Sequence, residues 1–143
     1  MFRILHLSDI HIGRTYKEPD SIACKITSDI ANNGLSGINC VVVTGDIFDG
    51  QAGTQQSLID IAVDFFETLL SEINSNQEKS PIGKGDIIFV PGNHDMIRDD
   101  DCQKRWCKYH DFLERFYGSI PSYYYLQNYA LFKKYEQQKI VFV

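Results

Sequence analysis

INCVVVTG, residues 38–45, is the stretch that decides the fold. A strand with one solvent-exposed face alternates apolar and polar residues, but here the apolar residues are nearly continuous. That composition is typical of a strand in a parallel sheet that is covered on both faces. The sequence therefore predicts a central parallel strand that ends at Gly45.

Two more short apolar runs flank this strand in the sequence, FRILHL at residues 2–7 and DIIFV at residues 86–90. Segments with apolar residues at helical spacing separate and follow these runs, at residues 20–34, 54–74 and 99–118. Strands that alternate with helices favour an α/β fold, in which crossover helices connect parallel strands. The end of the chain, residues 129–143, has two apolar runs around a Glu-Gln-Gln turn and predicts a terminal β-hairpin.

The same patterns predict which side chains reach the core. Ile22, Ile26 and Ile30 form one stripe of the first predicted helix. His6 lies within the first predicted strand and is expected in the core. The Lys and Arg residues of QKRWCKYH, residues 103–110, are expected on a solvated face.

A polar block follows each predicted strand: SDIH at residues 8–11, GDIFD at 45–49 and GNHD at 92–95. Each block alone could be an ordinary turn or a helix cap. Parallel strands, however, bring their carboxyl ends to one edge of the sheet, where α/β folds bind ligands. We therefore expect the three blocks to form one polar crevice.

The side chains of this crevice suit a metal ion. Several carboxylates in one crevice repel each other unless a cation lies between them. Mixed ligation by carboxylate, imidazole and amide groups favours a divalent ion such as Mn, Fe or Zn. The blocks contain no thiolate ligand, so a structural zinc site is not expected.

The three blocks resemble, in the same order, the D-x-H, G-D-x-x-D and G-N-H-D blocks of the calcineurin-like metallophosphoesterases. Each block is short, but the ordered set, with a strand before each block, is specific. The flanking residues most resemble those of the SbcD-type nuclease branch. The resemblance implies a layered α-β-β-α fold, of which this chain would hold the amino-terminal half, and phosphoester hydrolysis at a dinuclear metal site.

The resemblance also implies a role for each ligand position. Asp9 and His11 would hold the first metal, and Asp46 would bridge both metals. Asn93 would hold the second metal. Two such cations neutralise a phosphate and supply a nucleophilic water, so no side-chain base is required.

Two further residues are implied in catalysis rather than in metal binding. His94 would face the phosphate and protonate the leaving oxygen, and a positioned acid of this kind typically contributes a factor of about 10²–10⁴. Asp49 would orient His94 by accepting the other N–H of the imidazole ring. No residue is expected to bind an organic cofactor.

The sequence departs from the family pattern after the third block. The family needs a further histidine on the second metal and then a G-H-x-H block, but none of the four histidines follows His110. The second metal is therefore expected to bind weakly here. We expect residues 1–143 to be a single, truncated domain whose remaining ligands come from a missing carboxy-terminal half or from a partner chain.

Composition bounds the partners and leaves two functions open. The net charge of −5 gives no global basic field for nucleic acid or membrane, and the four cysteines form no C-x-x-C pair, which indicates reduced thiols in a cytoplasmic protein. The expected partner is a phosphoester substrate, with nucleic acid and nucleotide both open. The alternative is a non-catalytic binding or assembly module on a degenerate phosphoesterase fold. A nucleotide-binding or response-regulator domain is disfavoured because no glycine-rich phosphate loop is present.

Overall fold

Three parallel strands form the central sheet, as the apolar runs predict. They are β1 (Ile4–Leu7), β2 (Cys40–Thr44) and β3 (Ile87–Val90), paired in the order β1-β2-β3. The register aligns Leu7 with Val43 and Val43 with Phe89, so the three strands end almost level. The loops that follow the strands therefore begin at one edge of the sheet, as expected for an α/β fold.

The computed structural model describes residues 1–13, 19–50, 56–77, 81–99, 101–122, 124–125, 130–131, 133–136 and 139–142. In this part of the chain, no helix has both the length and the apolar character needed to cross a membrane.

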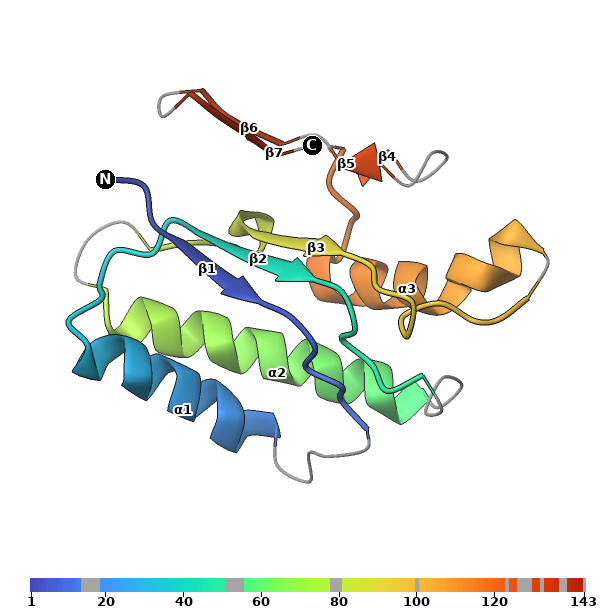
Figure 1. Cartoon of the computed structure of the whole chain (residues 1–143), viewed down its shortest axis with the longest axis horizontal. Coiled ribbons are helices and arrows are strands. Elements are labelled where there is room, and N and C mark those ends of the chain that lie inside the picture. Colours follow the sequence, from blue (N-terminus) through green and yellow to red (C-terminus); the bar gives the residue numbers. More distant parts are fainter. Residues whose placement is uncertain are drawn as a thin grey trace.

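Helices α1 (Pro19–Asn32), α2 (Gln56–Ser75) and α3 (Cys102–Tyr117) connect and follow the strands. Figure 1 shows α1 and α2 running along one face of the sheet. The core beneath β3 is aromatic: the Phe89 ring lies 4.8 Å from Phe66 of α2 and 5.0 and 5.2 Å from Phe112 and Phe116 of α3. Edge-to-face pairs of this kind add about 0.5–1.5 kcal/mol each beyond the burial of their area.

The predicted stripe of α1 packs against the core, but the most buried residues of the helix lie beside that stripe. Ile22, Ile26 and Ile30 are only partly buried, whereas Ala23 and Thr27 are fully covered. Small side chains allow a helix to approach its neighbours closely, which favours this face. The buried Thr27 hydroxyl is satisfied because it donates to the Ala23 carbonyl at 3.0 Å.

The expectation that His6 belongs to the core is wrong. Alternation along β1 turns Leu5 and Leu7 to the core, and His6 is exposed on the opposite face. Its Nε2 lies 2.6 Å from the Thr44 hydroxyl of β2. The sheet face that carries these residues is not covered by the three helices, so a polar side chain is tolerated there.

The predicted terminal hairpin is confirmed. Strands β6 (Lys133–Tyr135) and β7 (Ile140–Phe142) pair in antiparallel fashion, with Lys133 opposite Phe142. A second short pair, β4 (Tyr124–Tyr125) with β5 (Ala130–Leu131), was not predicted, because two-residue strands show no periodicity. Both pairs lie on the side of the sheet away from α1 and α2 (Figure 1).

Tyrosine hydroxyls cover the outer edge of β3. The Tyr124 hydroxyl accepts the Phe89 N–H at 2.7 Å and lies 3.1 Å from the Phe89 carbonyl, to which it donates. The Tyr117 hydroxyl donates to the Ile87 carbonyl at 2.6 Å. These contacts satisfy backbone groups that an edge strand would otherwise leave unpaired.

Candidate metal centre

The loops after β1 and β2 run side by side through a ladder of backbone hydrogen bonds. The Asp9 N–H donates to the Gly45 carbonyl at 3.3 Å, and the His11 N–H donates to the Asp46 carbonyl at 3.0 Å. Further along, Asp49 N–H donates to the Ile12 carbonyl at 3.1 Å. The first two polar blocks are thus fixed against each other by main-chain hydrogen bonds.

Asp9, His11 and Asp46 form the one cluster of potential metal-ligating side chains found in the described part of the chain. Their ligand atoms all lie within 4.8 Å of one another, and His11 Nε2 is 3.8 Å from Asp9 Oδ1. The expectation that these residues converge is confirmed. Two carboxylates and one imidazole are a donor set that fits a divalent ion such as Mn, Fe or Zn.

The backbone of all three residues is held in a left-handed conformation. The φ angles are 55° at Asp9, 51° at His11 and 53° at Asp46; Lys139, near the β6–β7 turn, is the other non-glycine residue with positive φ in the described chain. Such conformations cost about 1–3 kcal/mol each and persist where the surroundings impose them, often at functional sites. Their occurrence at all three cluster residues favours a site selected for its geometry rather than an incidental acidic group.

Two glycines allow the second and third blocks to meet. Gly45 has φ +83°, and a Cβ placed on it would lie 2.8 Å from Gly92 Cα. A Cβ on Gly92 would lie 2.5 Å from Asp46 N and would also collide with Asp46 Oδ1. These contacts leave no room for a side chain at either position, which explains why the second and third polar blocks each begin with a glycine.

Asp95 ties the same two blocks together from inside the protein. It is fully buried, and its Oδ1 accepts the Phe48 N–H at 3.0 Å while its Oδ2 accepts the Gly92 N–H at 2.8 Å. Burial raises the pKa of this carboxyl, and the two N–H donors act in the opposite direction. Asp95 was not among the predicted site residues, although its place at the end of the GNHD block was a usable signal.

Lys108 packs on the Phe48 ring. Its burial contradicts the expectation that the Lys and Arg residues of this segment lie on a solvated face. It is 6% exposed, and its Nζ lies 4.0 Å from the centre of the Phe48 ring with no hydrogen-bond partner among the described residues. Burial lowers the pKa of Lys108, whereas Asp95 and Asp49 favour its charged form. The signal that was missed is spacing, since Lys108 precedes the buried Phe112 by one helical turn.

The His94 ring lies beside the cluster. Its centroid is 5.2 Å from that of His11, at an interplanar angle of 82°, and its backbone N–H donates to Asp46 Oδ1 at 3.1 Å. Nδ1 accepts the Gly50 N–H at 3.0 Å, so the neutral ring carries its proton on Nε2. Asp49 was expected to orient this ring by accepting one of its N–H groups. Asp49 is buried and directly precedes Gly50 in the chain, and its role stays a prediction.

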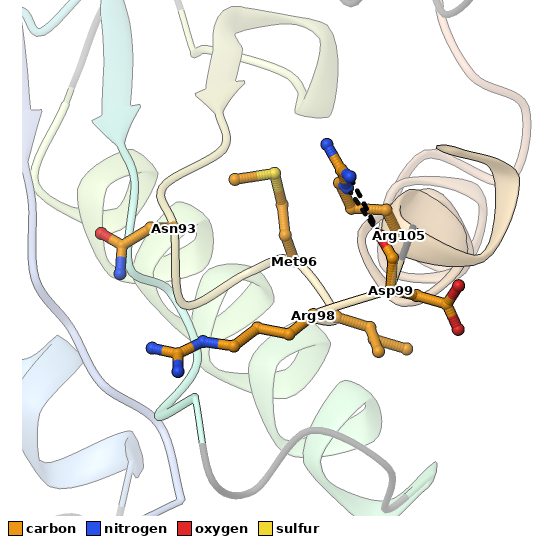
Figure 2. Close-up of a pocket in the computed structure, with 6 residues that line it drawn as sticks. Asn93, Met96, Arg98, Asp99 and Arg105 are labelled. Atoms are coloured by element: carbon orange, nitrogen blue, oxygen red, sulfur yellow. Dashed lines mark hydrogen bonds between the residues drawn. The ribbon is translucent and has the colours of Figure 1, made fainter. Parts of the chain in front are cut away.

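Asn93 is exposed and lines an open pocket beside the cluster, with Met96, Ile97, Arg98, Asp99 and Arg105 (Figure 2). It precedes His94, whose N–H contacts Asp46, so the chain brings it alongside the candidate metal ligands. Its role as ligand of a second metal stays a prediction. A divalent ion bound at this site would be held by Asp9, His11 and Asp46.

Comparison with known proteins gives a match along nearly the whole chain. Residues 2–143 match the family of calcineurin-like phosphoesterases. An uncharacterized protein of Acanthamoeba polyphaga mimivirus is 31% identical over 138 residues, which is 92% of this chain. The aligned part is 9% of the viral protein, so the chain spans only a small part of that relative.

Proposed function

Because this chain belongs to the calcineurin-like phosphoesterase family, whose members are metal-dependent hydrolases, we propose that it hydrolyses phosphoesters at the Asp9–His11–Asp46 cluster. The observation that carries the proposal is the convergence of these three side chains within 4.8 Å on left-handed backbone. Bound divalent ions would neutralise the phosphate and supply the attacking water.

The chain's own residues divide the remaining work. Oδ1 of Asp46 accepts the His94 backbone N–H. The carboxylate has further lone pairs on both oxygens, and these stay available for a metal. That hydrogen bond fixes the distance between a metal ligand and the candidate acid. The Gly50 N–H holds Nδ1 of His94 as an acceptor, so the neutral ring carries its proton on Nε2 and can donate a hydrogen bond to the leaving oxygen. Transfer of the proton itself would use the imidazolium form, in which Nδ1 also carries a proton and gives up the Gly50 bond.

The proposed site is uneven. Asp9, His11 and Asp46 offer three ligands to one metal, whereas the second would share Asp46 and take Asn93. Hard divalent ions prefer about six ligands, so the second ion binds weakly unless further groups complete it. This imbalance favours, as the second candidate function, a non-catalytic module that keeps the fold for binding or assembly.

Two alanine variants test the proposed roles. His94→Ala retains metal binding but loses about 10²–10⁴-fold in turnover of a diester with a poor leaving group. Its loss is much smaller for bis(p-nitrophenyl) phosphate, whose leaving group needs little protonation. Asp46→Ala loses both metal binding and turnover of every ester.

Metal content is measured by calorimetric Mn²⁺ titration of each variant, and turnover by release of the alcohol or nitrophenol. If His94→Ala loses metal as completely as Asp46→Ala, then His94 is a ligand and the roles are misassigned. If wild-type protein binds Mn²⁺ but hydrolyses neither ester, the non-catalytic module is the better account.

A further inference from the structure

The pocket lined by Asn93 has a volume of about 710 Å³, and Asn93 directly precedes His94, whose N–H contacts Asp46 of the candidate metal centre. Its lining combines apolar Met96 and Ile97 with the charged side chains of Arg98, Asp99 and Arg105. Asn93 is the one pocket residue that has a role in the mechanism proposed above. An open, partly apolar pocket with a few polar groups is a typical place for the organic part of a ligand.

The pocket wall is built by hydrogen bonds to the start of α3. The Ile97 N–H donates to the Arg105 carbonyl at 3.0 Å, and Arg105 donates to the Asp99 carbonyl from Nε at 3.1 Å and from Nη2 at 3.0 Å. Figure 2 shows the bonds from Arg105 to Asp99 as dashed lines. Asp101 N–H completes the turn by donating to Asp99 Oδ1 at 2.9 Å. The wall is therefore formed before any ligand binds.

Arg98 differs from Arg105 because its guanidinium is uncommitted. It is exposed and makes no hydrogen bond or ion pair with any residue in the described ranges. In Figure 2 its side chain is extended, with the guanidinium on the side of the pocket where Asn93 lies. The carboxylate of Asp99 points the other way in this view, so the two charges do not neutralise each other.

A guanidinium in this place suits an anion. Arginine presents a planar fork of N–H donors that matches the oxygens of a phosphate. The protein carries a net charge of −5, so its overall field does not attract a polyanionic substrate. Attraction of such a substrate then depends on a local cation. Asn93 links the two places, because it lines the pocket and precedes His94, whose N–H contacts Asp46.

We propose that the pocket binds the part of the substrate beyond the reacting phosphate, and that Arg98 binds a second phosphate there. This inference rests on the proposed function and narrows it to phosphoesters that carry another phosphate, such as a nucleoside diphosphate or an oligonucleotide. Met96 and Ile97 supply the apolar surface for the organic part of the substrate. A phosphomonoester without a second anion would not use Arg98.

The test is calorimetric binding of thymidine 5′-phosphate and thymidine 3′,5′-bisphosphate, each in Mn²⁺ and in EDTA. Arg98→Gln weakens the bisphosphate about tenfold, the effect of one charge-assisted hydrogen bond, and changes the monophosphate less than twofold. Arg115→Gln is the matched control, since Arg115 is exposed on α3 and pairs with Asp60 rather than lining the pocket.

Equal binding of the bisphosphate by wild type and Arg98→Gln overturns the proposal, as does equal weakening of both ligands. Failure of the proposed function gives a different result: Mn²⁺ then strengthens neither ligand, while the EDTA arm still measures the contribution of Arg98. Thymidine 5′-diphosphate and a thymidine trinucleotide separate the two sources of a second phosphate. The ligand whose binding depends more on Arg98 identifies the substrate, and dependence for neither contradicts the proposal.

Discussion

At the scale of single residues, Asp46 joins the most functions in the candidate site. Its carboxylate belongs to the metal-ligating cluster and accepts the His94 N–H at 3.1 Å, and its carbonyl accepts the His11 N–H at 3.0 Å. The sequence predicted the carboxylate, because residue type and spacing are visible there. It did not predict the left-handed backbone or the two hydrogen bonds, since these depend on how the three blocks meet.

The close approach of Gly92 to Asp46 gives the first prediction at this scale. Gly92→Ala places a methyl group 2.5 Å from Asp46 N, so the backbone must move, and we expect a loss of about 2–3 kcal/mol in the free energy of unfolding. Gly83→Ala is the control, because nothing lies within 4 Å of its added Cβ. Urea unfolding measures both variants; equal midpoints would show that the two blocks do not meet as described.

At the scale of elements, α3 shows what periodicity can and cannot predict. The helix was expected over residues 99–118 and spans Cys102–Tyr117. Its apolar residues Leu113 and Phe116 are buried, but the same face also buries Lys108. A hydrophobic pattern assigns lysine to the surface. Here the aromatic ring of Phe48 and the carboxylates of Asp95 and Asp49 stabilise the buried ammonium group of Lys108.

Tyr109, the neighbour of Lys108, provides the prediction at this scale. It is 5% exposed, and its hydroxyl has no hydrogen-bond partner among the described residues. An unsatisfied buried hydroxyl costs about 1–3 kcal/mol, so Tyr109→Phe should raise the free energy of unfolding by about 1 kcal/mol at neutral pH. Tyr124→Phe is the opposite control, because its hydroxyl bonds Phe89 and its loss should destabilise the protein.

The same residue predicts an alkaline pH dependence. Burial raises the pKa of Tyr109 well above its ordinary value of 10.0. A raised folded pKa contributes stability that is complete below pH 10.0 and is lost as the pH rises toward the folded pKa. A rise in pH from 9 to 11 should therefore lower the thermal unfolding temperature of wild type more than that of Tyr109→Phe. Parallel curves for the two proteins would contradict the burial of this phenol.

At the scale of the whole molecule, the order of strands and helices was predictable from the sequence. Which face of the sheet the helices leave uncovered was not. Continuous apolar runs and helical spacing predicted three parallel strands, three helices and the terminal hairpin. The two faces of the sheet differ, however: helices cover one, while His6 is exposed on the other. A strand of four residues does not contain enough pattern to distinguish these faces.

The central claim is that Asp9, His11 and Asp46 hold a divalent metal, and calorimetric Mn²⁺ titration tests it most directly. We expect one tight site in wild type with weak filling of a second, and loss of the tight site in Asp46→Asn. His6→Ala should bind as wild type does, since His6 lies outside the cluster. Unchanged Mn²⁺ binding by Asp46→Asn, or no binding by wild type, would contradict the claim, and two equally tight sites would show that ligands of the second metal were missed.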